Sequence, residues 1–249
     1  MARRIRVVGI GSGDPAQLTP AASAALSSVA FVVAAAKSED DPLLDVRRAL
    51  CAAAGIPLVA VRDPERDRAD PKDYPAAVRN WHDARVEAYA AVLEQNPGDV
   101  GFLVWGDPSL YDSTLRIVGR LADRLEASYD VVPGLSAPTL LAAAHRIVLH
   151  PVGKPVLVTT GRRLAAEVAA GHENLVVMLD GGLTCLDLES PRAWWIWWGA
   201  NLGTETERLV SGRLDEVAGE LREQRAAAKA DAGWVMDTYL LRATAPQVP

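Results

Sequence analysis

Short apolar runs rich in valine and isoleucine alternate along the first part of the chain with longer segments of helical periodicity. The apolar runs predict strands at Ile5–Ile10, Val29–Val33, Pro57–Val61, Val100–Trp105 and Tyr129–Val132. The segments between and after them predict helices at Thr19–Ser28, Asp45–Ala54, Ala76–Gln95, Ser113–Glu126 and Ala137–His145. The charged run Arg62–Asp73 predicts a solvated loop. Because strands alternate with helices, we expect a parallel sheet with right-handed crossovers.

The segment Pro151–Pro155 carries two prolines and a glycine and is expected to be a linker. Beyond it the pattern predicts strands at Val156–Thr159, Leu175–Leu179, Ala193–Trp198, Glu207–Ser211 and Gly233–Leu241, and helices at Leu164–Ala170 and Leu214–Lys229. The last strands follow one another with short connections, which favours a mixed sheet. We therefore expect an α/β protein of two domains, 1–150 and 156–249, joined by residues 151–155 and separated by a cleft.

Composition and charge limit the kinds of molecule that we expect this protein to bind. The chain has 49% hydrophobic and 23% charged residues, as a globular protein does. Its net charge of -6 and pI of about 5.3 argue against a broad attraction to nucleic acid. No apolar run reaches the roughly 18 residues of a membrane span, and the first residues lack the apolar core of a signal peptide. We expect a soluble, cytoplasmic protein without a membrane or nucleic-acid partner.

Cysteine and histidine usage gives no sign of a metal centre. Cys51 and Cys185 are the only cysteines and are expected to be reduced and buried. The histidines lack the spacing of metal ligands, so no metal is predicted. His145 stands near the end of a predicted helix, where a cation is favourable without any catalytic role.

Three glycine-bearing turns each follow a predicted strand and precede a helix, at Gly9–Pro15, Trp105–Tyr111 and Val132–Pro138. The first is not a dinucleotide-binding turn, because Asp14 and Pro15 stand where the third glycine would come, and no Gly-Lys-Ser/Thr of a P-loop follows. In open α/β sheets, ligands bind beyond the carboxyl ends of the strands. One such turn is often only a tight connection, but three at the same sheet edge predict a ligand site.

The ordered set of Gly-x-Gly-x-Gly-Asp-Pro, Gly-Asp-Pro-x-x-Tyr and Pro-Gly-x-Ser in these turns is similar to the tetrapyrrole methylases. The resemblance implies two α/β domains of that type, with S-adenosylmethionine bound in the cleft between them. Further segments resemble a member of the family that acts in the corrin pathway: Pro64–Arg68, Trp105–Arg116, Thr159–Arg163, Val177–Gly181, Trp198–Thr204 and Asp237–Arg242.

What the resemblance implies is methylation of a ring carbon of a corrin precursor, with loss of an acetyl group as acetic acid and no metal. It places the cofactor on Ser12, Gly13, Trp105, Gly106, Asp107, Leu110, Ser136, Ala137, Met178, Leu179 and Gly203. Backbone groups of glycine turns suit the ammonium and carboxylate of the methionine end, and an apolar strand end suits adenine. The superfamily also implies a homodimer. Asp107 could instead only cap the following helix.

Binding of the substrate and loss of its acetyl group require different residues. A tetrapyrrole precursor carries many carboxylates, so an acidic protein must bind it through a placed basic cluster. The candidates lie at predicted strand ends or helix starts: Lys37, Arg116, Arg162, Arg163 and Arg213. The Arg162–Arg163 pair could equally be surface charge. Tyr111 is the candidate for the acetyl step, with simple packing as the alternative.

Two departures leave alternatives open. Ala36 stands where related enzymes often have an aspartate, so any acid/base role there is absent or passes to Glu39 or Asp40. The indoles of Trp194, Trp195, Trp197 and Trp198 predict core packing, or else a platform for the macrocycle. Rival functions are a methylase of the same superfamily with another substrate (a different tetrapyrrole, a modified histidine of a translation factor or ribosomal RNA) and a protein that senses nucleotide or adenosylmethionine without catalysis.

Overall fold

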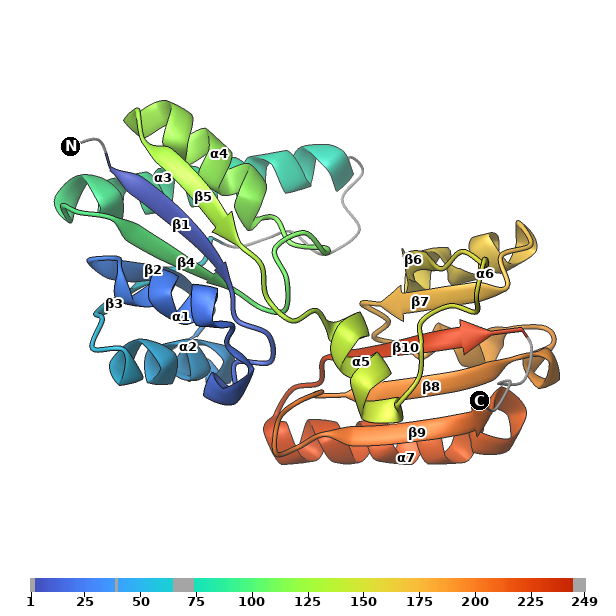
Figure 1. The fold of residues 1–249 in the computed structure, drawn as a ribbon. Helices are drawn as coiled ribbons and strands as arrows, with labels where there is room; N and C mark the ends of the chain where they lie inside the picture. The colour runs from blue at the N-terminus through green and yellow to red at the C-terminus, as the bar shows by residue number, and fades with distance from the viewer. Residues whose placement is uncertain (1–2, 39, 65–73, 244–249) are drawn as a thin grey trace. The chain divides into compact units, whose positions relative to one another are not determined.

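The structure, a computed structural model, describes residues 3–38, 40–64 and 74–243. It divides into two compact units, Met1–Leu135 and Ser136–Pro249 (Figure 1). Most of the predicted loop Arg62–Asp73, including the run that follows Pro64, lies outside the described residues, as does Glu39. In the described part of the chain no helix is long and apolar enough to cross a membrane.

The first unit is a parallel sheet with helices on both faces. Its strands are β1 (Arg4–Gly9), β2 (Phe31–Ala36), β3 (Leu58–Arg62), β4 (Val100–Val104) and β5 (Ser128–Val132), in the order β3-β2-β4-β1-β5. Its helices are α1 (Pro20–Ser27), α2 (Pro42–Ala53), α3 (Tyr74–Gln95) and α4 (Thr114–Leu125), with a 3-10 turn at Pro15–Gln17. This confirms the predicted alternation.

Alternating residues of each strand fill two separate cores. Ile5 and Val7 of β1 pack with α3 and α4, whereas Val8 and the following Ile10 pack with α1 and α2. Figure 1 shows these two helix pairs on opposite faces of the sheet. Because helices cover both faces, the central strands β2 and β4 are apolar throughout.

The second unit is a mixed sheet, as the short connections predicted. The strands are β6 (Leu157–Thr160), β7 (Asn174–Met178), β8 (Trp195–Ala200), β9 (Arg208–Arg213) and β10 (Asp237–Arg242), in the order β6-β7-β10-β8-β9. Only β6 and β7 pair in parallel. The helices are α5 (Ala137–His145), α6 (Gly161–Ala169) and α7 (Leu214–Ala232), with 3-10 turns at Thr184–Asp187 and Pro191–Ala193.

Helix α5 belongs to the second unit by its packing. Leu141 is fully buried against Val176, Trp197 and Leu240 of that sheet. The sequence placed the boundary after this helix, at residue 150, because the two prolines of 151–155 were the clearest punctuation. The contacts instead divide the chain after Leu135, within the third glycine turn.

The tryptophan run packs in the second unit's core on both sides of the sheet. Trp194 and Trp198 are buried with α6 and α7, and Trp197 is buried on the α5 side, where Arg242 stacks on its ring at 5.1 Å. The burial of these three indoles agrees with the prediction that they pack in the core. Trp195 is partly buried.

Candidate functional site

The three glycine turns pack backbone against backbone at the carboxyl edge of the first sheet. The N–H of Gly11 donates to the carbonyl of Gly106 at 3.2 Å, and the N–H of Gly106 donates to the carbonyl of Gly11 at 2.8 Å. A Cβ on Gly9 would lie 2.5 Å from the nitrogen of Gly134, and one on Gly134 would lie 2.2 Å from the oxygen of Gly106. No side chain fits at Gly9 or Gly134, so the backbones of the three turns lie in direct contact.

Gly13 ends the first turn against the second. Its φ of +86° is one that L side chains rarely adopt, and a Cβ there would lie 2.5 Å from Val46 and 2.9 Å from the ring of Trp105. Its N–H donates to the carbonyl of Ile10 at 2.9 Å. The hydroxyl of the preceding Ser12 accepts the N–H of Asp14 at 3.3 Å. The sequence pattern thus identified a turn whose geometry requires glycine.

Asp107 ties the second turn to the third. One carboxylate oxygen accepts the N–H of Gly134 at 3.0 Å, and the other accepts the N–H of Ser109 at 2.9 Å and its hydroxyl. Burial opposes ionisation, but these hydrogen bonds outweigh it and hold the pKa of Asp107 below its usual value. Asp107 therefore fixes the site geometry through its side chain. Leu110 closes the same turn, donating its N–H to the Asp107 carbonyl at 3.2 Å.

The remaining predicted cofactor residues lie in the second unit. Ser136 caps α5 by accepting the N–H of Thr139 at 3.3 Å, and Ala137 begins that helix. Met178 ends β7, and Leu179 follows with a φ of +54° and 65% exposure. A large apolar residue with a left-handed backbone conformation and an exposed side chain is uncommon. Residues in such backbone conformations cluster at functional sites. Gly203 has a φ of +73° and donates its N–H to Glu207 at 2.7 Å.

A buried carboxylate that the sequence did not single out, Asp180, follows Leu179 in the chain. Asp180, 3% exposed, accepts the hydroxyl of Tyr239 at 2.5 Å and both the N–H and hydroxyl of Thr184, at 2.8 and 3.0 Å. A Cβ on Gly161 would lie 2.4 Å from this carboxylate, so the start of α6 packs directly on it. Asp180 therefore joins the motif segments 159–163, 177–181 and 237–242 into one network.

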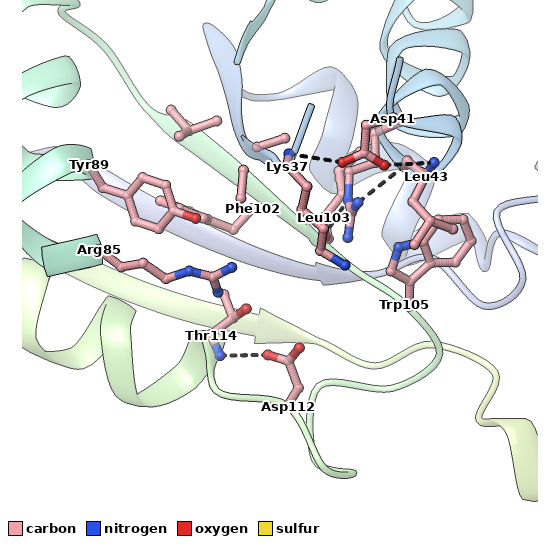
Figure 2. A pocket seen from close by; sticks show the side chains of 14 residues that line it. Lys37, Asp41, Leu43, Arg85, Tyr89, Phe102, Leu103, Trp105, Asp112 and Thr114 are labelled. Carbon is pink, nitrogen blue, oxygen red and sulfur yellow. Dashed lines mark hydrogen bonds between the residues drawn. The ribbon is translucent and has the colours of Figure 1, made fainter. Parts of the chain in front are cut away.

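A cavity of about 190 Å³ opens in the first unit beside Trp105. Figure 2 shows Lys37 and Trp105 beyond the ends of β2 and β4, Asp41 at the start of α2, Arg85 and Tyr89 on α3, and Asp112 just before α4. The lining residues are Val33, Ala34, Ala35, Lys37, Asp41, Leu43, Arg47, Arg85, Tyr89, Phe102, Leu103, Trp105, Asp112 and Thr114. Because Trp105 contacts the Gly13 turn on one side and lines the cavity on the other, the cavity adjoins the predicted cofactor turns.

The basic residues that the sequence proposed lie in different settings. Lys37 is exposed and lines the cavity, whereas Arg116 is exposed on α4 and does not line it. Arg162 is exposed at the start of α6. The neighbouring Arg163 pairs with Glu167 at 2.7 Å, and Arg213 pairs with Asp215 at 3.2 Å.

The cavity arginines, Arg47 and Arg85, were missed. They lie within helices rather than at turns, so no local signal marks them, and only the packing of α2 and α3 on the sheet brings them to the rim.

Two other candidates from the sequence remain, Tyr111 and His145. Tyr111 has a φ of +50° and is 47% exposed, directly after the second glycine turn. The ring nitrogen Nε2 of His145 bonds to the carbonyl of Trp198 at 2.9 Å, and burial lowers the pKa of this histidine. His145 thus fastens α5 to its sheet. Among the described residues, no cluster of histidine, cysteine or carboxylate side chains could hold a metal ion.

The family of Tetrapyrrole (Corrin/Porphyrin) Methylases matches residues 4–218 of this chain. The chain therefore belongs to the tetrapyrrole methylase family, and its two α/β sheets confirm the predicted fold class. A more specific similarity is to the precorrin-6A synthase [deacetylating] of Sinorhizobium sp, which is 43% identical over 250 residues, covering 96% of this chain and 95% of that protein.

Solved structures agree with that placement. A putative cobalamin synthesis related protein from Corynebacterium diphtheriae has a TM-score of 0.83 and 38% identity, covering 98% of this chain and 99% of its own. A uroporphyrin-III C-methyltransferase from Thermus thermophilus, complexed with S-adenosylhomocysteine, has a TM-score of 0.58 and 22% identity, covering 96% and 92%. The second likeness shows a shared fold alone.

Proposed function

We propose that this protein is an S-adenosylmethionine-dependent C-methyltransferase that converts precorrin-5 to precorrin-6A with release of acetate. The observation that carries the proposal is the 43% identity to a precorrin-6A synthase along almost the whole of both chains. The segments that first suggested a corrin enzyme, 159–163, 177–181 and 237–242, meet around Asp180 in the structure. These contacts support the interpretation that the three motif segments act together.

The glycine turns fit the proposed cofactor. Positions 9, 13 and 134 exclude any Cβ, so the edge offers amides and carbonyls at close range. These groups would hold the charged methionine end, and Met178 and Leu179 would provide an apolar surface for adenine. S-adenosylmethionine bound there would supply the methyl group and leave as S-adenosylhomocysteine once its sulfonium–methyl bond breaks. The new bond to C1 would use the electron pair of the bond between C1 and the acetyl carbon, and water would take up the acetyl group as acetate. The chain's own contribution to this step is alignment of the reacting atoms.

Tyr111 is the residue that we propose for the acetyl step. Its exposed phenol follows the Gly106–Asp107 turn, and a phenol O–H can donate a hydrogen bond to a carbonyl oxygen. Such a donor would stabilise the charge that develops on the acetyl oxygen as water attacks. Tyr111→Phe keeps the ring and removes only the hydroxyl, so it should slow acetate release by roughly 100-fold if the hydroxyl is that donor. Unchanged release in this variant would leave Tyr111 with a packing role.

The assembly and location are also proposals. Membership of the family and the sequence pattern support a homodimer that works in the cytoplasm on a small tetrapyrrole, without nucleic acid, membrane or metal. Light scattering coupled to size-exclusion chromatography should give twice the chain mass. A mass equal to one chain at micromolar concentration would contradict the dimer.

The decisive experiment is mass spectrometry of the product formed from precorrin-5 and S-adenosylmethionine. The product should have lost one acetyl group and gained one methyl group, with acetate released in equal amount. A product that keeps its acetyl group, or methylation only of another tetrapyrrole, would assign the protein to a different member of the family. Cofactor binding with no product would support a sensing protein without catalysis.

A further inference from the structure

Arg47 in the cavity of the first unit is a partly buried cation that forms no ion pair with a carboxylate in the described part of the chain. Its Nε donates to the carbonyl of Leu103 at 3.1 Å, and one terminal nitrogen donates to the carbonyl of Leu43 at 3.2 Å. The guanidinium lies 5.2 Å from the ring of Trp105. Arg47 makes no ion pair with any residue in the ranges 3–38, 40–64 and 74–243. The two carbonyls and the ring fix its position, and the negative charges of Asp41 and Asp112 act on it without forming an ion pair.

The donors of Arg47 are only partly used. A guanidinium carries five N–H donors in a planar fork, and the two carbonyls take one each. Burial lowers the pKa of Arg47, while nearby Asp41 acts in the opposite direction. An arginine nevertheless stays protonated in proteins. Its remaining donors therefore suit an anionic acceptor, and a carboxylate matches the fork with two parallel hydrogen bonds.

The other charged groups of the cavity are already engaged. Arg85 forms two hydrogen bonds of 2.7 Å with Asp63 and stacks on Trp81. Asp41 caps α2, accepting the backbone N–H groups of Lys37, Leu43 and Leu44 at 3.1 to 3.3 Å.

Asp112 in the same way accepts the N–H of Thr114 at 2.5 Å, at the start of α4. These two carboxylates are therefore held by amides at helix starts. Arg47 inside the cavity and the exposed ammonium of Lys37 are the lining cations for which no carboxylate partner is present among the described residues.

The size of the cavity limits what it can hold. Pockets that enclose a drug-sized molecule occupy roughly 300–1,000 Å³, and this one measures about 190 Å³. It accommodates one arm of a large ligand rather than a macrocycle. Tyr89 and Phe102 supply apolar walls suited to the carbon stem of such an arm.

We propose that this cavity binds one carboxylate-bearing side arm of the tetrapyrrole substrate, with Arg47 binding the carboxylate inside and Lys37 contacting it at the rim. The proposal rests on the proposed function, because it takes the ligand to be a tetrapyrrole. Trp105 links the cavity to the Gly13 turn, so an arm held here would place the macrocycle beside the proposed cofactor turns. Arg47 is thereby a substrate-specificity residue.

The test compares Arg47→Gln with Arg48→Gln. Arg48 is the next residue on the same helix, but it is exposed and pairs with Asp45 at 2.8 Å, so it is a matched control. Arg47→Gln should raise the KM for precorrin-5 about 10- to 150-fold, as expected when a charged hydrogen-bond partner is lost. The dissociation constant for S-adenosylhomocysteine, measured by titration calorimetry, should change less than about twofold. Equal KM values for Arg47→Gln, Arg48→Gln and the unmodified protein would overturn the proposal.

Two further variants keep the proposal testable if Arg47→Gln does not fold. Lys37 contributes only its backbone N–H to the contacts above, so Lys37→Met should fold normally and still raise the KM. Arg47→Lys keeps the charge but loses the planar fork, and its KM should lie between those of the unmodified protein and Arg47→Gln. A normal KM in both variants would contradict the assignment even if Arg47→Gln were unstable.

Free acetate distinguishes a substrate arm from the released product as the source of the carboxylate. If the cavity binds a substrate arm, added acetate should compete weakly with precorrin-5, and Arg47→Gln should raise the KM. If Arg47→Gln abolishes acetate inhibition but leaves the KM unchanged, the cavity holds the product and the proposal fails.

The proposed function can fail separately. Should precorrin-5 not react, binding of uroporphyrin III followed by absorbance tests the cavity directly. Weaker binding in Arg47→Gln than in Arg48→Gln would support it, and equal binding would refute it.

Discussion

At Gly13 the backbone conformation and the packing place separate demands on the same residue. The φ of +86° disfavours any L side chain, and Val46 and Trp105 occupy the space that a Cβ would need. Asp107 works in the opposite way, because its side chain supplies the bonds that hold the turns together. The turns therefore depend on Gly13 because it has no side chain, and on Asp107 because its carboxylate accepts hydrogen bonds from Ser109 and Gly134.

Gly13→Ala should weaken cofactor binding by at least tenfold and lower the free energy of unfolding by about 1–3 kcal/mol. A left-handed non-glycine residue costs about 1–2 kcal/mol, and overpacking costs a similar amount. Calorimetry with S-adenosylhomocysteine and urea unfolding would measure both effects. Gly119→Ala is the control, since a Cβ there meets nothing within 4 Å in helix α4. Unchanged affinity in Gly13→Ala would show that the turn is only a connection.

Asp107→Asn should reduce the loss of stability in acid. A carboxyl whose pKa is lower in the folded state stabilises the fold above its unfolded pKa of about 3.9, and this contribution disappears as pH falls through the folded pKa. Urea unfolding between about pH 5 and 2 should therefore show a shallower decline in the variant than in the unmodified protein. Parallel curves would mean that Asp107 is not held ionised by Ser109 and Gly134.

At the scale of helices and strands, the sequence predicted the strands and the longer helices, but not the short 3-10 turn Thr184–Asp187 that holds Thr184 against Asp180. Helix α2 begins at Pro42 rather than near Asp45, because Asp41 caps it with two hydrogen bonds, a signal that the apolar periodicity does not contain. Strand β2 extends to Ala36 through alanines that have low strand propensity, since pairing with β3 holds them. A local helix cap decided the first case, and pairing with a neighbouring strand decided the second.

The candidate site was only partly predictable for the same reason. Glycine turns can be recognised in a sequence because their backbone geometry restricts the residue type. Gly13 and Gly106 could therefore be found from the sequence pattern. Arg47 and Asp180 act through residues far away in the chain, at Leu103 and Tyr239, and no local spacing encodes those contacts. The sequence pattern identified the glycine turns, which remain a predicted cofactor site, and it did not identify the buried charges of Arg47 and Asp180.

Asp180→Ala should lower the free energy of unfolding by about 1–3 kcal/mol, because the hydroxyls of Tyr239 and Thr184 lose a buried acceptor. Tyr239→Phe removes one donor instead and should cost less. If Asp180 also sets the conformation of Leu179, cofactor affinity should fall in Asp180→Ala and stay nearly normal in Tyr239→Phe. Denaturant unfolding and calorimetry on the same samples would separate the two effects, and stable Asp180→Ala protein would contradict the network's role.

At the scale of the whole molecule, each unit carries its own set of basic residues. The first has Arg47 and Lys37 at the cavity, and the second has Arg162 and Arg163 at the start of α6. Arg163 already pairs with Glu167 on the surface, where such a pair contributes only about 0–1 kcal/mol. That pairing is weak enough for a substrate carboxylate to replace Glu167. Both sets remain predicted substrate contacts.

Combining variants tests whether the two sets bind the same substrate molecule. Arg162→Ala with Arg163→Ala should raise the KM for precorrin-5 well above tenfold and leave cofactor affinity nearly unchanged. Free-energy effects of distant, independent contacts add, so joining this pair with Arg47→Gln should multiply the two increases in KM. Glu167→Gln is the matched control, because it frees Arg163 without removing it and should lower the KM slightly. If the α6 pair has no effect alone and none in combination, these two arginines are surface charge and substrate recognition belongs to the first unit.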